Sequence, residues 1–137
     1  MKKILIMMML LLPLVAFAQE DKAVTKMLEK RYSCVRFERS YGDKDKFSYY
    51  YRVDNASYKS GICDINGNEI IPPKYTHCFY AAGERYFCVS LNDKAGVYDI
   101  VSGDYVVPMK YESCYYMSEE RFFKVELNDK KGVYDIV

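Results

Sequence analysis

The chain has 137 residues, with 20 lysines and arginines against 19 aspartates and glutamates and a formal net charge of +1. A balance this close to neutral, without a run of basic residues, argues against a nucleic-acid partner, because such partners are held by clustered Lys and Arg. Fifteen tyrosines stand beside no tryptophan. Tyrosine favours strands and can bury its ring while its hydroxyl stays in water, so the composition indicates a β-rich protein.

The N-terminus has the three parts of a secretory signal peptide. Lys2 and Lys3 precede an apolar run at residues 4–15, and Ala16-Phe17-Ala18 follows as a peptidase recognition pattern. The run is shorter than the roughly 20 apolar residues that a membrane-spanning helix needs. We therefore predict a signal peptide over residues 1–18, export to the periplasm or beyond the cell, and no transmembrane segment in the mature chain.

The mature chain, residues 19–137, is one domain's worth of sequence, and the loss of two lysines leaves 18 basic residues against 19 acidic ones. Residues 19–32 place apolar side chains at a helical spacing, so this segment is predicted to be a short helix or a mobile terminus. Residues 33–60 alternate apolar and polar side chains on both sides of a turn-like stretch at 41–45. We interpret them as a hairpin and a degenerate capping repeat.

The remaining sequence contains two similar copies of one segment. Residues 74–101 and 110–137 agree at 18 of 28 positions at a shift of 36, and SLNDKAGVYDIV is answered by ELNDKKGVYDIV. Self-similarity at such a period is typical of a repeat array. We predict one repeat over residues 61–95, and a second repeat with a terminal half-repeat over residues 96–137. The chain ends partway through a unit, so its last strand either closes the array or belongs to a longer one.

Each unit reads as a small meander of strands. Asn66-Gly67 predicts a two-residue type I′ turn, and Asn92-Asp93 predicts a second tight turn. Pro72 is expected to end its strand, and residues 74–83 are expected to connect units, with room for one helical turn. The predicted fold class is all-β: an open, curved, antiparallel meander of tandem β-hairpin repeats of roughly 35 residues, with eight to nine short strands.

Side chains along a strand alternate between two faces, which predicts a register and a core. Pairing across Asn92-Asp93 sets Val89 against Gly96 and Phe87 against Tyr98. In the second copy, Phe123 and Val125 then face the core while Lys124 faces out. The slot of Lys124 holds Cys88 in the first copy, so the Cys88 thiol is expected to be accessible.

The chain has five cysteines, an odd number without a C-x-x-C pair. Buried free thiols are favoured for three of them: Cys63, Cys78 and Cys114. Three aspartates adjoin predicted turns, where a carboxylate can accept backbone N–H bonds, and capping is favoured over catalysis for them. They are Asp64, Asp99 and Asp135.

The units resemble the WG-containing repeat family. The resemblance rests on G-I-C-D-I-N-G-N-E-I-I-P-P-K-Y at residues 61–75 and on G-V-Y-D-I with V-V-P-M-K-Y at residues 96–111. Ser60, Ala95 and Lys131 stand where the family carries its tryptophan. The resemblance implies a β-repeat scaffold and little about activity.

No pattern in the sequence points to catalysis, a cofactor or a metal. The single histidine, His77, is replaced by Ser113 in the other copy, and the glycines follow the repeat rather than a phosphate-binding loop. We expect a non-catalytic exported scaffold that binds a protein at the cell envelope. The alternative is a module that binds envelope glycans or cell wall through repeated tyrosines.

Aromatic residues that recur outside the predicted core are the candidate binding residues. They are Tyr80, Tyr116, Tyr86 and Phe122. Exposed aromatic rings offer a large contact area at a low entropy cost. The competing interpretation, about equally weighted, is that these rings pack between units.

Overall fold

The computed structural model describes residues 19–41 and 47–135, so the predicted signal peptide lies outside the described residues. One helix precedes eleven strands in the described chain. Their bounds are α1 Lys22–Glu29, β1 Cys34–Tyr41, β2 Phe47–Asp54, β3 Ser60–Cys63, β4 Glu69–Tyr75, β5 His77–Ala82, β6 Tyr86–Leu91, β7 Lys94–Asp99, β8 Asp104–Tyr111, β9 Ser113–Met117, β10 Phe122–Leu127 and β11 Lys130–Asp135.

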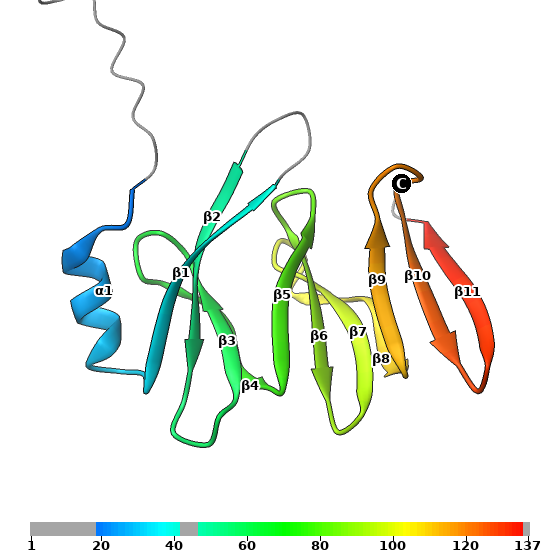
Figure 1. The fold of residues 1–137 in the computed structure, drawn as a ribbon, viewed down its shortest axis with the longest axis horizontal. Helices are drawn as coiled ribbons and strands as arrows, with labels where there is room; N and C mark the ends of the chain where they lie inside the picture. The colour runs from blue at the N-terminus through cyan, green and yellow to red at the C-terminus, as the bar shows by residue number, and fades with distance from the viewer. Residues whose placement is uncertain (1–18, 42–46, 136–137) are drawn as a thin grey trace, which may run out of the picture.

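The strands form three antiparallel sheets, in the orders β1-β2-β3-β4, β5-β6-β7-β8 and β9-β10-β11. The sheets follow one another along the long axis of the molecule, with α1 at one end and β11 at the other (Figure 1). Every strand pairs with its neighbour in sequence within its sheet. The predicted open array of antiparallel hairpin repeats and the short N-terminal helix are confirmed.

The two repeated hairpins have the predicted register. Val89 pairs with Gly96 and Phe87 with Tyr98 across the β6–β7 turn. Asn92 and Asp93 both have positive φ, at 52° and 60°, and Asn128-Asp129 in the β10–β11 turn repeat this at 51° and 59°. Positive φ at both central residues defines the type I′ turn, whose twist matches that of the flanking strands.

The turn at Asn66-Gly67 differs from the prediction. Only Gly67 has positive φ, and the Gly67 N–H donates to the Asp64 carbonyl at 3.0 Å, so the turn spans four residues. The Asp64 carboxylate accepts the backbone N–H groups of Asn66 and Asn68, both at 2.9 Å. Asp64 therefore caps this turn, as predicted.

The segment expected to connect units is also extended. β4 continues past Pro72 to Tyr75, and β5 begins at His77. Ile62 pairs with Ile71 while Ser60 pairs with Tyr75, so four residues of β4 span two of β3. A bulge of this kind takes prolines out of the ladder without ending the strand. The strand count is therefore higher than the eight to nine expected.

The middle sheet is buried on both faces. On the side of the first sheet, Phe87 and Val89 of β6 lie in one core cluster with Tyr50, Ile62, Ile71, Tyr75 and Cys78. On the other side, Cys88 and Val97 lie in a second cluster with Val107, Cys114, Phe123 and Val125. The expectation that the Cys88 thiol is accessible is wrong, because the face opposite the first core is covered by the third sheet.

The outer face of the first sheet is covered by α1. Leu28 is fully buried against Tyr51, Val53 and Cys63. The Asp21 carboxylate caps the helix by accepting the N–H of Ala23 at 2.8 Å. One end of the stack is thus closed by an amphipathic helix.

Candidate binding surface

The predicted binding residue Tyr80 lies between the first two sheets. It is half-buried, with its ring centroid 6.4 Å from that of Tyr50 on β2 and 5.8 Å from that of Phe87 on β6. Its hydroxyl accepts the Glu84 N–H at 3.2 Å. Tyr80 therefore contributes to packing between units, which is the competing interpretation of the sequence.

Tyr86 and Tyr116 pack between the second and third sheets. Their ring centroids lie 6.1 Å and 5.2 Å from that of Phe123, which is fully buried. Both tyrosines are half-buried. Of the four predicted residues, Phe122 alone lies on the side of the third sheet that faces away from the stack, and it is also half-buried. The expectation that these aromatics stand exposed is therefore corrected.

A different pair of aromatics is both repeated and exposed. Phe79 is 45% exposed and Tyr115, one repeat later, is 39% exposed. Alternation along the strand could have identified them, because each follows a cysteine that was predicted to be buried, Cys78 or Cys114. Both line a shallow groove of about 200 Å³ between β5 and β9, beside His77 and Glu112.

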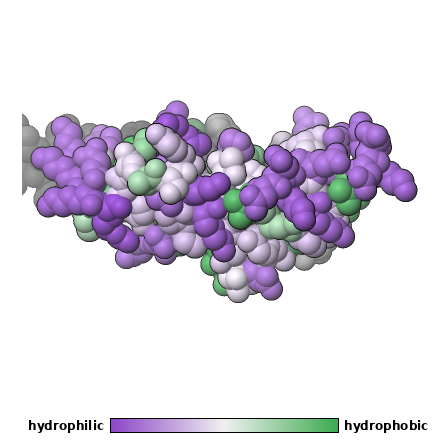
Figure 2. All heavy atoms as spheres, turned by 90° about the horizontal axis from the view of Figure 1, so that it is seen from below, coloured by the Kyte–Doolittle hydropathy of each residue, from purple (hydrophilic) through white to green (hydrophobic). Residues whose placement is uncertain are grey.

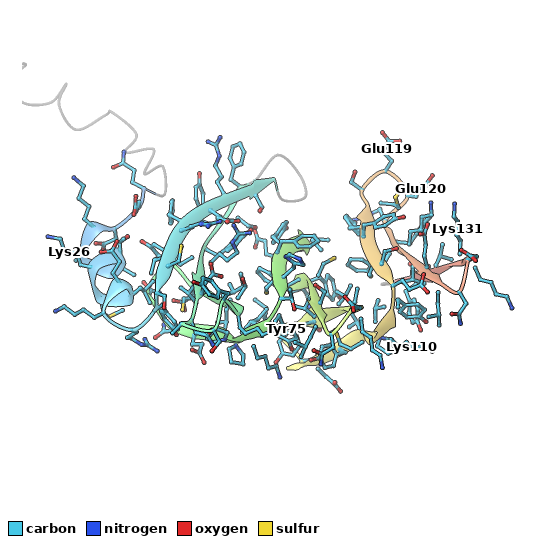
Figure 3. The ribbon with its side chains drawn as sticks, turned by 60° about the horizontal axis from the view of Figure 1, so that its bottom comes forward. Lys26, Tyr75, Lys110, Glu119, Glu120 and Lys131 are labelled. Atoms are coloured by element: carbon cyan, nitrogen blue, oxygen red, sulfur yellow. The ribbon has the colours of Figure 1, made fainter. Side chains whose placement is uncertain are left out.

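The outward side of the third sheet is a second surface, which we call the terminal face. It consists of Tyr115, Met117, Phe122, Lys124, Glu126, Lys131 and Val133, which pair across β9, β10 and β11. The terminal face is hollowed by a groove of about 470 Å³, and Glu120 stands at its rim. Figure 3 shows Lys131 at this end of the molecule, with Glu119 and Glu120 on the loop between β9 and β10.

Corresponding residues of the second sheet show what distinguishes the terminal face. Val97 is fully buried, whereas Val133 in the same slot is 63% exposed. Cys88, 3% exposed, corresponds to Lys124, whose ammonium lies 5.8 Å from the Tyr115 ring centroid. The backbone is repeated, but in the described chain no further sheet covers this side.

The lower side of the stack is mostly hydrophilic, with small separate apolar patches (Figure 2).

The third sheet also has an open edge at β11. In the first two sheets, β3 and β7 are each followed by a fourth strand, β4 and β8. Within the described residues, β11 has a partner only in β10. A groove of about 550 Å³ runs along this edge, lined by Tyr111, Leu127, Gly132 and Tyr134 among others.

The one buried charged side chain among the described residues is Asp99, at 2% exposed. The Arg85 guanidinium binds both carboxylate oxygens, with Nε 2.8 Å from Oδ1, and the Val101 N–H donates to Oδ1 at 3.0 Å. The Arg85 hydrogen bonds lower the pKa of Asp99 to about 2. Asp99 therefore stays ionised and holds the β5–β6 loop against the end of β7, a capping role as predicted.

No group of three or more His, Cys, Asp or Glu side chains in residues 19–41 and 47–135 is placed to hold a metal ion. The helix that the structure describes is neither long enough nor apolar enough to cross a membrane.

Comparison with known proteins adds a family match. The model of the family described as WG containing repeat matches residues 61–94 and 96–130, which together are half of the chain. No curated protein and no solved structure matches the chain. The matched segments cover β3 to β10 and most of both core clusters.

Proposed function

Because the chain belongs to the WG containing repeat family, we propose that it is an exported, non-catalytic β-repeat scaffold that binds a protein at the cell envelope through its terminal face. Repeat arrays present extended surfaces built from successive units and commonly use them to hold other proteins. The open terminal face carries this proposal, since the matching faces of the first and second sheets, around Ile62 and Val97, are each covered by the next sheet.

The chemistry of the terminal face suits a protein partner. Tyr115, Phe122 and Val133 supply aromatic and aliphatic area, and Lys124, Glu126 and Lys131 stand among them. Protein interfaces combine an apolar, aromatic centre with a polar rim in this way. The neighbouring sheet already shows the mode of packing, because the equivalent face around Cys88 and Val97 is buried against Phe123 and Val125.

Export and the lack of catalysis are supported by separate observations. The basic start, short apolar run and Ala16-Phe17-Ala18 pattern are those of a cleaved signal. Asp99 is occupied by its ion pair with Arg85, so it is not free to act as a general acid or base. Cell fractionation with mass measurement of the mature protein tests export: Gln19 is the expected first residue, and an uncleaved cytoplasmic chain would overturn it.

Site-specific photo-crosslinking tests the terminal face. A photoreactive residue at Val133, 63% exposed, is expected to capture a discrete protein partner in envelope preparations. The matched control is the same residue at Val101, which is 69% exposed but lies in the turn between β7 and β8. An adduct at position 133 that is absent at position 101 supports the proposal. Equal labelling at both positions, or none at position 133, contradicts it.

A glycan-binding role is the second candidate, and the exposed pair Phe79 and Tyr115 favours it. Aromatic faces beside polar groups such as His77 and Glu112 can stack on sugar rings. The variant Phe79→Ser tests this role, because Phe79 does not belong to the terminal face. If glycan binding is the function, Phe79→Ser should lower retention on envelope polysaccharide, while Tyr58→Ser, at a 90% exposed position, should not. Unchanged retention would exclude this candidate.

A further inference from the structure

The first two sheets are closed at one edge by strands of the same sequence type. β4 carries Ile70-Ile71-Pro72-Pro73-Lys74-Tyr75 and β8 carries Val106-Val107-Pro108-Met109-Lys110-Tyr111. Both follow the pattern aliphatic, aliphatic, Pro, any residue, Lys, Tyr. Their registers also agree: Val97 pairs with Val107 and Ala95 with Tyr111, as Ile62 pairs with Ile71 and Ser60 with Tyr75.

Each of these strands bulges across a glycine. A Cβ built on Gly96 would lie 2.6 Å from the Val107 carbonyl oxygen and 3.0 Å from the Met109 nitrogen. The first sheet repeats this clash, since a Cβ on Gly61 would meet the carbonyl oxygen of Ile71 and the backbone at Pro72 and Pro73. Neither glycine has positive φ. Close approach of the neighbouring strand is therefore what demands glycine at these positions.

Gly132 occupies the same slot of β11 with no such neighbour. A Cβ there would meet only Val125 Cγ2, at 3.4 Å, and the φ of Gly132 is not positive either. Nothing in the described chain requires glycine at position 132. β11 therefore has the glycine of this glycine–bulge contact, but the described chain supplies no bulged strand to pass over it.

The groove beside β11 matches the shape of the missing strand. The equivalent groove of the second sheet, between Tyr75, Leu91 and Lys94, measures about 310 Å³ and includes Tyr105 and Met109 of β8 in its walls. In the third sheet Tyr111, Leu127 and Lys130 take those three places, and the groove widens to about 550 Å³. The larger groove is the space that two side chains of a fourth strand occupy elsewhere.

Hydroxyl pairing shows the same difference. The Tyr75 and Tyr105 hydroxyls are hydrogen-bonded at 2.5 Å, which ties β8 to the end of β4 in the preceding sheet. Tyr111, the counterpart of Tyr75, instead bonds to the Tyr134 hydroxyl at 2.6 Å. An incoming tyrosine in the Tyr105 position would find a hydroxyl partner already in place.

We propose that β11 accepts an extended strand of a partner protein, antiparallel to β11 and of the pattern aliphatic, aliphatic, Pro, any residue, Lys, Tyr. The inference rests on the proposed protein-binding function and specifies how the partner is held. The second aliphatic residue lies opposite Val133, the proline passes over Gly132, and the tyrosine lies opposite Lys131. Main-chain hydrogen bonds supply affinity and the glycine–bulge contact supplies register, as in other cases of strand addition.

The probe for this proposal is a labelled synthetic peptide with the sequence of residues 104–111, titrated into the purified protein. Saturable binding is expected. Gly132→Val should weaken it at least tenfold, because its side chain stands where the bulged carbonyl passes. The variant should keep the wild-type melting temperature, since position 132 is exposed. Val133→Ala, a matched change on the same strand, should weaken binding less than Gly132→Val.

A second peptide keeps the test independent of how the variant folds. N-methyl groups at both Val106 and Val107 block whichever of the two amides faces β11, and this peptide should bind at least tenfold more weakly than the parent. Absence of binding by the parent peptide, or equal binding by Gly132→Val, overturns the proposal. Dimerisation that Gly132→Val abolishes, with no peptide binding, would assign the edge to a second copy instead.

The experiments distinguish a failure of the proposed function from a failure of strand addition. A partner adduct at position 133 that persists in Gly132→Val keeps protein binding at the terminal face and rejects strand addition. Peptide binding without any partner adduct supports strand addition and rejects protein binding at the terminal face.

Discussion

At the residue scale, one slot of the repeat carries different side chains according to what covers it. Cys88 and Val97 lie against the third sheet and are at most 3% exposed. Their counterparts Lys124 and Val133 lie on the terminal face, where Lys124 can keep its ammonium in water and its stem on the sheet. The β6 slot that the third sheet covers holds a buried thiol, and the uncovered slot of β10 holds a charge.

The thiols give a residue-level prediction. Burial raises the pKa of Cys78 to about 12 and also raises the pKa of Cys63. Cys88 donates a hydrogen bond to Cys114, which together with burial raises its pKa well above the ordinary value. The thiolate is the reactive form. Under native conditions iodoacetamide should therefore modify Cys34, the half-buried cysteine, first. Peptide mass mapping checks the order, and early labelling of Cys88 would mean that the second and third sheets separate.

The Asp99–Arg85 pair predicts a pH dependence. Arg85 holds the folded-state pKa of Asp99 at about 2, below its value in the unfolded chain, near 3.8. The resulting stabilisation is complete above about pH 4 and is lost as the pH falls towards 2. Asp99→Asn should lower the free energy of unfolding at pH 7 by about 1–2 kcal/mol and flatten its fall between pH 4 and 2. Urea titrations across that range measure both effects.

The control for this prediction is Asp104→Asn, since Asp104 is exposed and forms no ion pair with any of the described residues. It should leave the acid limb of the stability curve unchanged. An unchanged curve in Asp99→Asn would show that the ion pair does not couple folding to protonation.

At the element scale, β10 tests which face of the third sheet is covered. Val125 is 3% exposed and lies opposite both Gly132 and Cys114, whereas Lys124 is half-buried on the terminal face. Val125→Asp should cost about 3 kcal/mol or more, because it buries a charge without a partner. Lys124→Asp should change stability by about 0.5 kcal/mol or less. Equal losses in urea unfolding would contradict the register.

Repeated aromatics on β5 and β9 divide in the same way. Tyr80 and Tyr116 pack against Phe87 and Phe123, so the double variant Tyr80→Ser with Tyr116→Ser should lower stability by about 2 kcal/mol or more. The matched double variant Phe79→Ser with Tyr115→Ser removes rings that are 45% and 39% exposed and should melt close to wild type. The reverse order of melting temperatures would show that the two faces of these strands are exchanged.

The parts of the fold that the sequence predicted correctly depend on local patterns, namely turn residues and the alternation of side chains along a strand. Asn92-Asp93 and the alternation of Phe87 and Val89 predicted the β6–β7 hairpin and its register, and both are confirmed. β5 and β9 were missed because they are five or six residues long and have few flanking strand signals. Pro72 was expected to end its strand, but the strand bulges around Pro72 and continues.

The candidate binding residues were harder to predict because their exposure depends on how the sheets pack against one another. Alternation separates two faces of a strand but does not say which face is covered. Tyr86 and Cys88 lie on the side that a single-sided sheet would expose, and in this stack the third sheet covers it. Phe79 stays accessible at the margin between the second and third sheets, and Tyr115 stays accessible on the terminal face. Only the stacking of whole units decides between these outcomes.

At the scale of the whole molecule, the stack is asymmetric. α1 closes one end through Leu28, the middle sheet is covered on both sides, and the third sheet is covered on one side by the second sheet (Figure 1). Stability in repeat arrays comes from each unit and from its contacts with neighbours. The third sheet has one such neighbour in the described chain and one strand fewer than the others, so its stability should be the lowest of the three.

The two nearly identical hairpins make this a controlled measurement. Residues 86–99 and 122–135 share most of their sequence and both have a type I′ turn, so intrinsic exchange rates and turn strain nearly cancel. Amides that open locally exchange according to the free energy of that opening. By hydrogen–deuterium exchange, β10 and β11 should be at least tenfold less protected than β6 and β7, which corresponds to about 1.4 kcal/mol. Equal protection would mean that the array opens as one cooperative unit, and that neighbour contacts rather than local coverage set the stability of every sheet.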